Sequence, residues 1–238
     1  LEEQLEHARA LVRPQVKTER ILIVQHASYH QGIIGLIAGK LTEEFYRPSI
    51  VLSINQDVAK ASARSIPGFD VIGAIREAQE LVIEAGGHPM AAGFSIATDK
   101  IEALTQKLRA IAAEKIDELM LTPKLMIEAE VKPEDVNEQL WQTLEQLEPF
   151  GMGNHRPTLA LMGMTIAETR LVGSEGKHIK MKLKELPGVE VMGFNLGWRL
   201  AELMPETKID AAFSLDKNVW QGRASLQLKL KDVRQAKN

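Results

Sequence analysis

The chain has 238 residues, of which 45% are hydrophobic and 26% charged, a composition typical of a globular protein with one large domain or two ordinary ones. It contains no cysteine, which excludes disulfides and thiolate metal sites and is compatible with a cytoplasmic protein. The longest apolar runs are too short to span a bilayer and no secretory signal opens the chain, so we expect no membrane partner.

The net charge of −3 is unevenly distributed along the chain. Residues 1–157 carry 16 Lys and Arg against 23 Asp and Glu, a net charge of −7, whereas residues 158–238 carry 13 against 9, a net charge of +4. A basic part within an acidic whole indicates a local anionic partner rather than general adhesion to polyanions.

The first residues of the chain, 1–13, have helical spacing, with apolar side chains at Leu5, Leu11 and Val12. The chain begins at Leu1 rather than at a methionine. We therefore expect a fragment of a longer protein whose first helix is trimmed.

Residues 21–121 have the pattern of an α/β domain, a mixed sheet with flanking helices. Short apolar runs predict strands, and apolar residues at helical spacing predict the helices between them. The expected strands are 21–24, 49–54, 58–65 and 94–97, and the expected helices are 32–45, 70–85 and 100–119. Asp70 is the expected N-cap of the second helix. Alternating strands and helices imply a layered sheet.

Residues 122–238 change to a pattern made mostly of strands. A strand over 125–131 and a connecting helix over 134–148 come first, followed by a loop rich in proline and glycine. Strands of period two are then expected over 158–172, 177–184, 189–194, 209–215 and 224–233, with one short helix over 198–204. Five strands and one helix in about 80 residues fit a small all-β barrel of the oligonucleotide-binding (OB) type.

One glycine-rich run, Gly86-Gly87-His88-Pro89-Met90-Ala91-Ala92-Gly93, surrounds a single imidazole with very little side-chain bulk. Such a run lets its backbone approach a ligand closely, and backbone N–H groups beside an imidazole suit a phosphate or sugar-phosphate. The alternative is a tight turn between a helix and a strand.

A second pattern lies on the expected strand 58–65. Positions two apart share one face of a strand, so Ser62 and Arg64 point the same way and form a competent phosphate clamp. The alternative is an edge strand with a solvated arginine. His30 lies between the first strand and the following helix, where α/β sheets often bind ligands, although a lone histidine there is more often a cap or packing residue than a catalyst.

The barrel strands carry a third pattern, two polar faces rich in cations. One face holds His178, Lys180, Lys182 and Lys184, and the other holds Ser225, Gln227, Lys229 and Lys231. Lysines on a shared face suit a nucleic-acid backbone, and Trp220, beside the Gln221-Gly222 turn, suits stacking on a base. The alternative is a solvated barrel face and a core tryptophan.

In their order and combination these motifs resemble the RecJ family of single-stranded-DNA-specific exonucleases. The first part, with Tyr29-His30-Gln31-Gly32-Ile33-Ile34-Gly35, Ser62-Ala63-Arg64-Ser65 and the glycine-histidine run, resembles the family's DHH-associated substrate domain. The second part, with Leu147-Glu148-Pro149-Phe150-Gly151-Met152-Gly153-Asn154, Gly176-Lys177-His178 and the lysine-rich strand 225–232, resembles its OB domain. Tyr29, Gln31 and His155 depart from the usual family pattern.

The resemblance implies a role in DNA repair and recombination. It implies a cytoplasmic enzyme in which an N-terminal DHH domain, absent from this chain, binds Mn²⁺ or Mg²⁺ in cis. Residues 1–20 would be the end of the helix that joins the two domains, residues 21–121 the DHH-associated domain and residues 122–238 the OB domain. Ser62 and Arg64 would bind the 5′-terminal phosphate of single-stranded DNA, and His30, Gly87 and His88 would line the cleft. The chain shows no Asp/His cluster for two metals, so we expect no bound cofactor and no activity from it alone.

Two other functions stay open on the sequence. One is a stand-alone nucleic-acid-binding module without an enzymatic partner domain. The other is a fragment of an oligonucleotide or cyclic-dinucleotide phosphoesterase, which would leave the barrel without a role.

Overall fold

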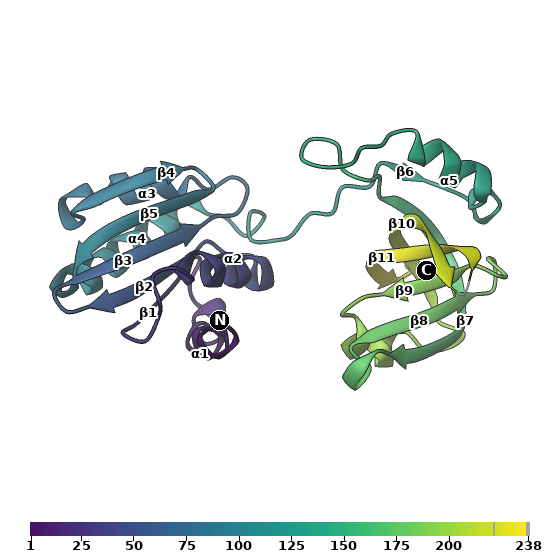
Figure 1. Ribbon diagram of the computed structural model, residues 1–238, viewed down its shortest axis with the longest axis horizontal. Helices are drawn as coiled ribbons and strands as arrows, with labels where there is room; N and C mark the ends of the chain where they lie inside the picture. The colour runs from purple at the N-terminus through teal and green to yellow at the C-terminus, as the bar shows by residue number, and fades with distance from the viewer. Residues whose placement is uncertain (221, 237–238) are drawn as a thin grey trace. The chain divides into compact units, whose positions relative to one another are not determined.

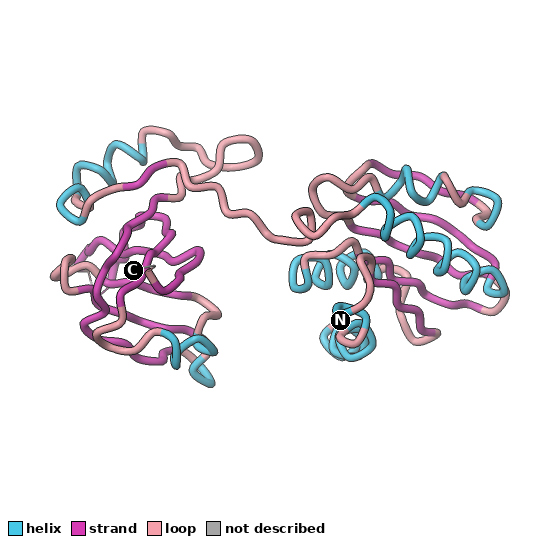
Figure 2. Tube along the Cα trace, turned by 180° about the vertical axis from the view of Figure 1, so that it is seen from behind, coloured by secondary structure: helices cyan, strands magenta, loops and turns pink. Residues whose placement is uncertain are grey.

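The computed structural model describes residues 1–220 and 222–236, apart from the side chains of Trp220 and Arg223. The chain divides into two compact units, Leu1–Lys124 and Leu125–Asn238. Figure 1 labels the helices and strands of each unit, and Figure 2 separates helices, strands and loops by colour.

The first unit is built on a mixed five-stranded sheet in the order β1-β2-β3-β5-β4. The strands are β1 (Leu22–His26), β2 (Ser49–Asn55), β3 (Val58–Arg64), β4 (Glu84–His88) and β5 (Ala91–Ala97). Strands β1 and β2 are parallel, and the other neighbours are antiparallel. This is the mixed sheet that the sequence predicts.

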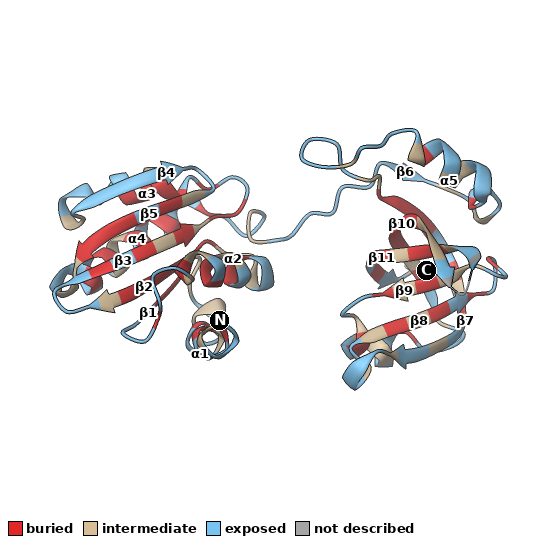
Figure 3. Cartoon of the chain, viewed as in Figure 1, coloured by how far each residue is buried: buried red, intermediate tan, exposed pale blue. Residues whose placement is uncertain are grey.

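Helices cover the two faces of this sheet to different extents. On one face α3 (Val71–Arg76) and α4 (Ile101–Lys115) enclose a core that draws on β1, β2, β3 and β5, with Ile50, Ala61 and Phe94 all at or below 6% exposure. On the other face α1 (Glu2–Val12) and α2 (Ile34–Phe45) pack on apolar residues of β1 and β2. On that second face Lys60 of β3 and Gly93 of β5 are exposed, whereas Ser95 of β5 is buried, and strand β4 is exposed along its whole length (Figure 3).

The predicted helix over 70–85 and the glycine-histidine turn require correction. Asp70 caps α3 as expected, accepting a hydrogen bond from the Gly73 backbone N–H at 3.0 Å, but the helix ends at Arg76. A 3₁₀ turn, η2 (Gln79–Leu81), follows, and the Ile83 N–H then joins the sheet by donating to the Ser95 carbonyl. The glycine-histidine run therefore forms strand β4, and the turn comes after it, before Ala91. The other 3₁₀ turns of this unit are η1 (Gln15–Lys17) and η3 (Thr98–Lys100).

The second unit is a closed five-stranded barrel, as the OB pattern predicts. The strands run β7-β8-β9-β11-β10 around the barrel, and pairing of β10 with β7 closes it. Their bounds are β7 (Leu159–Val172), β8 (His178–Leu183), β9 (Glu190–Gly193), β10 (Lys208–Trp220) and β11 (Arg223–Gln235). A two-residue strand, β6 (Ala129–Glu130), adds to β7, and the core includes fully buried Ile179, Val191 and Phe213.

Two predicted elements of this unit are shorter in the structure. Of the strand expected over 125–131, only β6 pairs with a neighbour. The helix expected over 134–148 divides into η4 (Pro133–Asp135) and α5 (Glu138–Glu145), because Asn137 takes an extended backbone and caps α5 by accepting the Leu140 N–H at 3.0 Å. This unit also has two further 3₁₀ helices, η5 (Ser174–Gly176) and η6 (Gly197–Glu202). The second of them stands where an α-helix is expected over 198–204.

Candidate functional site

The phosphate clamp, Ser62 and Arg64, lies at the end of β3 on the accessible sheet face. The two side chains are in contact, since Arg64 Nη1 donates to Ser62 Oγ at 3.2 Å and to the Ala63 carbonyl at 2.9 Å. Both residues are half-buried. Among the described residues, no carboxylate engages the Arg64 guanidinium, which leaves donors free for an anion.

The start of helix α2 lies against this clamp. A Cβ atom added to Gly35 would be 3.2 Å from Ser62 Oγ and 3.3 Å from Arg64 Nη2. The N-cap residue, Ile33, has no side chain that could accept the first N–H groups of the helix. Unpaired N–H groups and the helix dipole attract anions, so a guanidinium, a hydroxyl and a helix N-terminus converge here.

Beside the clamp the sheet has a floor without side chains. Gly93 of β5 is the register partner of Ser62, and Gly86 of β4 is the register partner of Gly93. A Cβ atom on Gly86 would meet nothing within 4 Å, and one on Gly93 would meet only the Ala61 carbonyl at 3.7 Å. Packing within the chain therefore does not require these glycines, and they leave the backbone open to a ligand. We call this surface the glycine floor.

The glycine floor lies in a depression of about 430 Å³ with a polar wall at its far side. Lys60 Nζ donates to Glu84 at 2.8 Å and to Ser95 Oγ at 2.6 Å, and Ser95 Oγ donates to Glu84 at 2.7 Å. The hydrogen bond from Lys60 lowers the pKa of Glu84 below its usual range. A ligand on the floor thus has the Arg64 guanidinium at one end and the Lys60–Glu84 ion pair at the other.

Of the three expected cleft residues, the structure places His88 on the clamp side. Arg64 and His88 are both register partners of Ala91, so they share one face of the sheet, two strands apart. His30 lies in the loop before α2, where its Nδ1 accepts the Gly32 N–H at 3.1 Å and its Nε2 is the donor. Gly87 differs from expectation, because it pairs with buried Ala92 and belongs to the opposite face.

The barrel exterior does not have the cation-rich faces that the sequence suggests. Its residues form two rows across the strands. The acidic row is Glu168, Lys182, Glu190, Gln227 and Asp216, and the basic row is Arg170, Lys180, Met192, Lys229 and Ser214. The carboxylates come from neighbouring strands and, in the case of Glu206, from the turn before β10, and they pair with most of the expected lysines. Lys180 contacts Glu190 at 2.5 Å, Lys182 contacts Glu168 at 2.8 Å, Lys184 contacts Glu206 at 2.7 Å, and Lys229 contacts Asp216.

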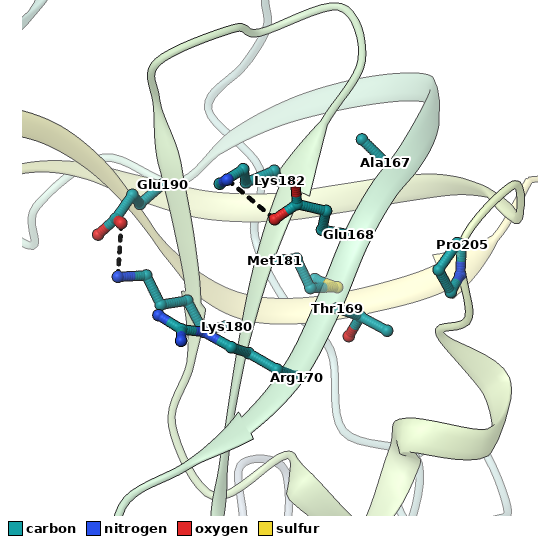
Figure 4. A pocket seen from close by; sticks show the side chains of 9 residues that line it. All are labelled: Ala167, Glu168, Thr169, Arg170, Lys180, Met181, Lys182, Glu190 and Pro205. Carbon is teal, nitrogen blue, oxygen red and sulfur yellow. Dashed lines mark ion pairs between the residues drawn. The ribbon is translucent and has the colours of Figure 1, made fainter.

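Figure 4 shows the part of these rows that surrounds a depression of about 480 Å³. Arg170, which the sequence reasoning missed, is exposed and stands opposite Lys180 in the register. The hydrogen bond from Lys182 holds the pKa of Glu168 below its usual value, so this carboxylate stays charged at neutral pH. The face is nearly balanced in charge.

The remaining predicted barrel residues have different surroundings. Ser225 is exposed, but Gln227 is only 8% exposed, because it lies in the middle of the acidic row between β9 and β10, and it is therefore not a surface contact. Lys231 Nζ donates to Thr158 Oγ1 at 2.8 Å. His178 is half-buried. The side chain of Trp220 lies outside the described residues.

Across residues 1–220 and 222–236, no group of three or more His, Asp or Glu side chains is arranged to hold an ion. No helix in the described part of the chain has the length and apolarity needed to cross a membrane.

Comparison with known families divides the chain as the structure does. The sequence pattern of the DHHA1 domain matches residues 16–114, and that of the RecJ OB domain matches residues 127–232. The crystal structure of RecJ in complex with Mn²⁺ from Thermus thermophilus superposes with a TM-score of 0.79 and 26% identity, covering 99% of this chain and 34% of that one. A second structure of that protein, with Mg²⁺, gives a TM-score of 0.78.

Relatives from several bacteria carry the name RecJ as well. The single-stranded-DNA-specific exonuclease RecJ of Bacillus subtilis is 30% identical over 231 residues, which is 96% of this chain and 29% of that protein. The RecJ proteins of Escherichia coli and Thermus thermophilus are 27% and 29% identical over 89% and 93% of the chain. The chain spans 29–38% of the length of these relatives.

Proposed function

The chain belongs to the RecJ family, of which it carries the DHHA1 and RecJ OB domains, and we propose that it holds the substrate of a 5′-directed exonuclease of single-stranded DNA. The DHHA1 domain takes the 5′-terminal phosphate, and the OB domain takes the strand that follows. The observation that carries this proposal is the convergence of Arg64, Ser62 and the start of α2 beside the glycine floor.

The chemistry of a terminal phosphate matches this convergence. Arg64 supplies paired charge-assisted donors, Ser62 a hydroxyl, and the start of α2 unpaired backbone N–H groups. A terminal phosphate enters a half-buried clamp more easily than an internal one, which is held by chain on both sides. The glycine floor then lets the first sugars of the strand lie close to the sheet backbone.

We assign cleavage to a part of the RecJ proteins other than the described residues. A metal ion would activate the attacking water in such an enzyme, and no ligand set for it occurs in the part of the chain that the structure describes. The contribution of this chain is therefore binding and positioning. We place the enzyme in the cytoplasm, in DNA repair and recombination.

Fluorescence anisotropy of the full 238-residue chain tests the clamp. A labelled oligothymidine is titrated with either a 5′-phosphate or a 5′-hydroxyl end. Arg64→Ala should reduce the preference for the phosphate by about 2 kcal/mol, the scale of a charge-assisted hydrogen bond, and Ser62→Ala should cost less because it removes a neutral partner.

Arg76→Ala is the matched control, because Arg76 is an exposed arginine at the end of α3. It should leave the preference for the phosphate unchanged. If Arg64→Ala weakens binding of both oligonucleotides equally, Arg64 does not contact the terminal phosphate.

A further inference from the structure

Two large aromatic side chains are exposed in the segment that joins β9 to β10. Trp198, on η6, is 76% exposed, and Phe194, directly after β9, is 48% exposed. The other aromatic residue whose burial is described on the barrel strands, Phe213, is fully buried. Exposed rings so close in sequence indicate a contact surface rather than incomplete packing.

The loop that carries these rings is fixed to the neighbouring strand. His178 Nδ1 accepts the Asn195 N–H at 3.0 Å, and the His178 and Phe194 rings meet edge to face with centroids 5.3 Å apart. The Gly197 N–H donates to the Lys177 carbonyl at 3.0 Å, and a Cβ atom on Gly197 would lie 2.0 Å from the Gly176 carbonyl oxygen. The Phe194 ring is therefore held against His178, and the backbone that carries Trp198 is fixed beside Gly176 and Lys177.

The charges beside the rings have a definite order. The basic row includes Arg170 and Lys180, and the next outward residue of β8 is His178, which touches Phe194. The spacing of two residues along a strand is about 6.6 Å, the span of a sugar between a phosphate and its base. On the other side of the basic row lies the acidic row, which repels phosphates. The surface thus offers Arg170 and the Lys180–Glu190 ion pair next to His178 and the Phe194 ring.

We propose that Phe194 and Trp198, with His178, form a base-stacking site of the OB domain. This inference rests on the proposed binding of single-stranded DNA. The strand crosses the barrel with its phosphates along the basic row at Arg170 and Lys180, and its bases turn toward the rings. Aromatic rings accept any base, so the site reads no sequence.

An abasic oligonucleotide separates stacking from phosphate contacts. The full chain is titrated with a 5′-hydroxyl oligothymidine and with one of equal length in which tetrahydrofuran residues replace the nucleotides. The double variant Phe194→Leu, Trp198→Leu should bind oligothymidine roughly tenfold more weakly per stacked ring and the abasic strand as well as wild type does. The variant Phe194→Tyr, Trp198→Phe should keep wild-type affinity for both.

Three other results overturn the inference. If the leucine variant binds oligothymidine normally while Lys180→Ala weakens binding, DNA follows the barrel without stacking on Phe194 and Trp198. These two rings would then be an exposed surface for a protein partner. If the leucine variant loses affinity equally for both strands, the rings act through the fold, which thermal unfolding would confirm. If wild type binds neither strand, the proposed function itself fails. Met162→Ala, an exposed apolar residue of β7, is the control for loss of apolar surface.

Discussion

Replacing Gly87 with alanine should destabilise the DHHA1 domain, whereas the same change at Gly86 should not. Gly87 has φ of +148°, and a Cβ atom there would lie 2.3 Å from the Ala91 carbonyl oxygen and 2.6 Å from Ala92 Cα. Both obstacles are backbone of β5, so β4 and β5 must separate locally. Strained backbone of this kind costs about 1–3 kcal/mol. All five residues of β4 are exposed, so β4 can detach from the sheet without exposing a core. Detachment therefore limits the loss in unfolding free energy of the Gly87→Ala variant to about 2 kcal/mol.

Urea unfolding and amide hydrogen exchange measure this prediction. A loss of about 2 kcal/mol in a domain of this size lowers Tm by roughly 8 °C, and the amides of β4 should lose protection first. Gly86→Ala should leave stability unchanged or slightly higher, because its Cβ atom meets nothing within 4 Å. It should instead weaken binding of 5′-phosphorylated DNA by narrowing the glycine floor. Equal unfolding free energies for the two variants would show that a Cβ atom at position 87 does not clash with the backbone of β5.

Other variants test other parts of the chain. Gly35→Ala should lower the preference for a 5′-phosphate, measured by anisotropy, because its methyl group crowds the phosphate clamp. The pure chain should not degrade single-stranded DNA with Mn²⁺, and products on a denaturing gel would contradict our assignment of cleavage. Glu190→Gln should raise DNA affinity at low salt roughly two- to fivefold by freeing Lys180, and lower affinity would show that the ion pair organises the site. Burial raises the pKa of Asp216, but hydrogen bonds led by that from Lys229 outweigh it, so the folded pKa is depressed. The stabilisation is therefore complete above the unfolded pKa and is lost as pH falls through the folded value, and Asp216→Asn should remove this part of the acid dependence of Tm.

The barrel could be predicted from the sequence because its strands alternate. Over most of their core-facing length β7 to β11 place apolar residues inward at every second position, with shifts at the bulges, and that period is visible in a single strand. Strand β4 has no such signal, because all of its residues are exposed and two are glycines. The preceding residues continue a helical spacing, so the sequence predicts a helix as far as Ala85. In the structure the helix ends at Arg76, and the Ile83 N–H pairs with the Ser95 carbonyl of β5.

The candidate sites also have a part that local sequence predicts and a part that it does not. The contact between Ser62 and Arg64 was predictable because the two residues are two positions apart on one strand, whereas their binding of a phosphate stays a prediction. The carboxylates of the acidic row were not, because they reach the lysines through the register of strands such as β8 and β9. Glu190 meets Lys180 in space although no local pattern joins them. The closeness of Gly35 to the clamp also depends on tertiary packing, although Gly35 lies in one of the motifs of the sequence.

Strand β4 also bears on how copies of this chain meet one another. It is the outermost strand of its sheet, and its free backbone groups are a template for a strand from another molecule. The two glycines have low strand propensity, and Pro89 directly after the strand carries no N–H donor, so the edge is a poor template. The residues that leave room for a ligand therefore also discourage edge-to-edge association, and a valine at position 86 would favour aggregation at high protein concentration.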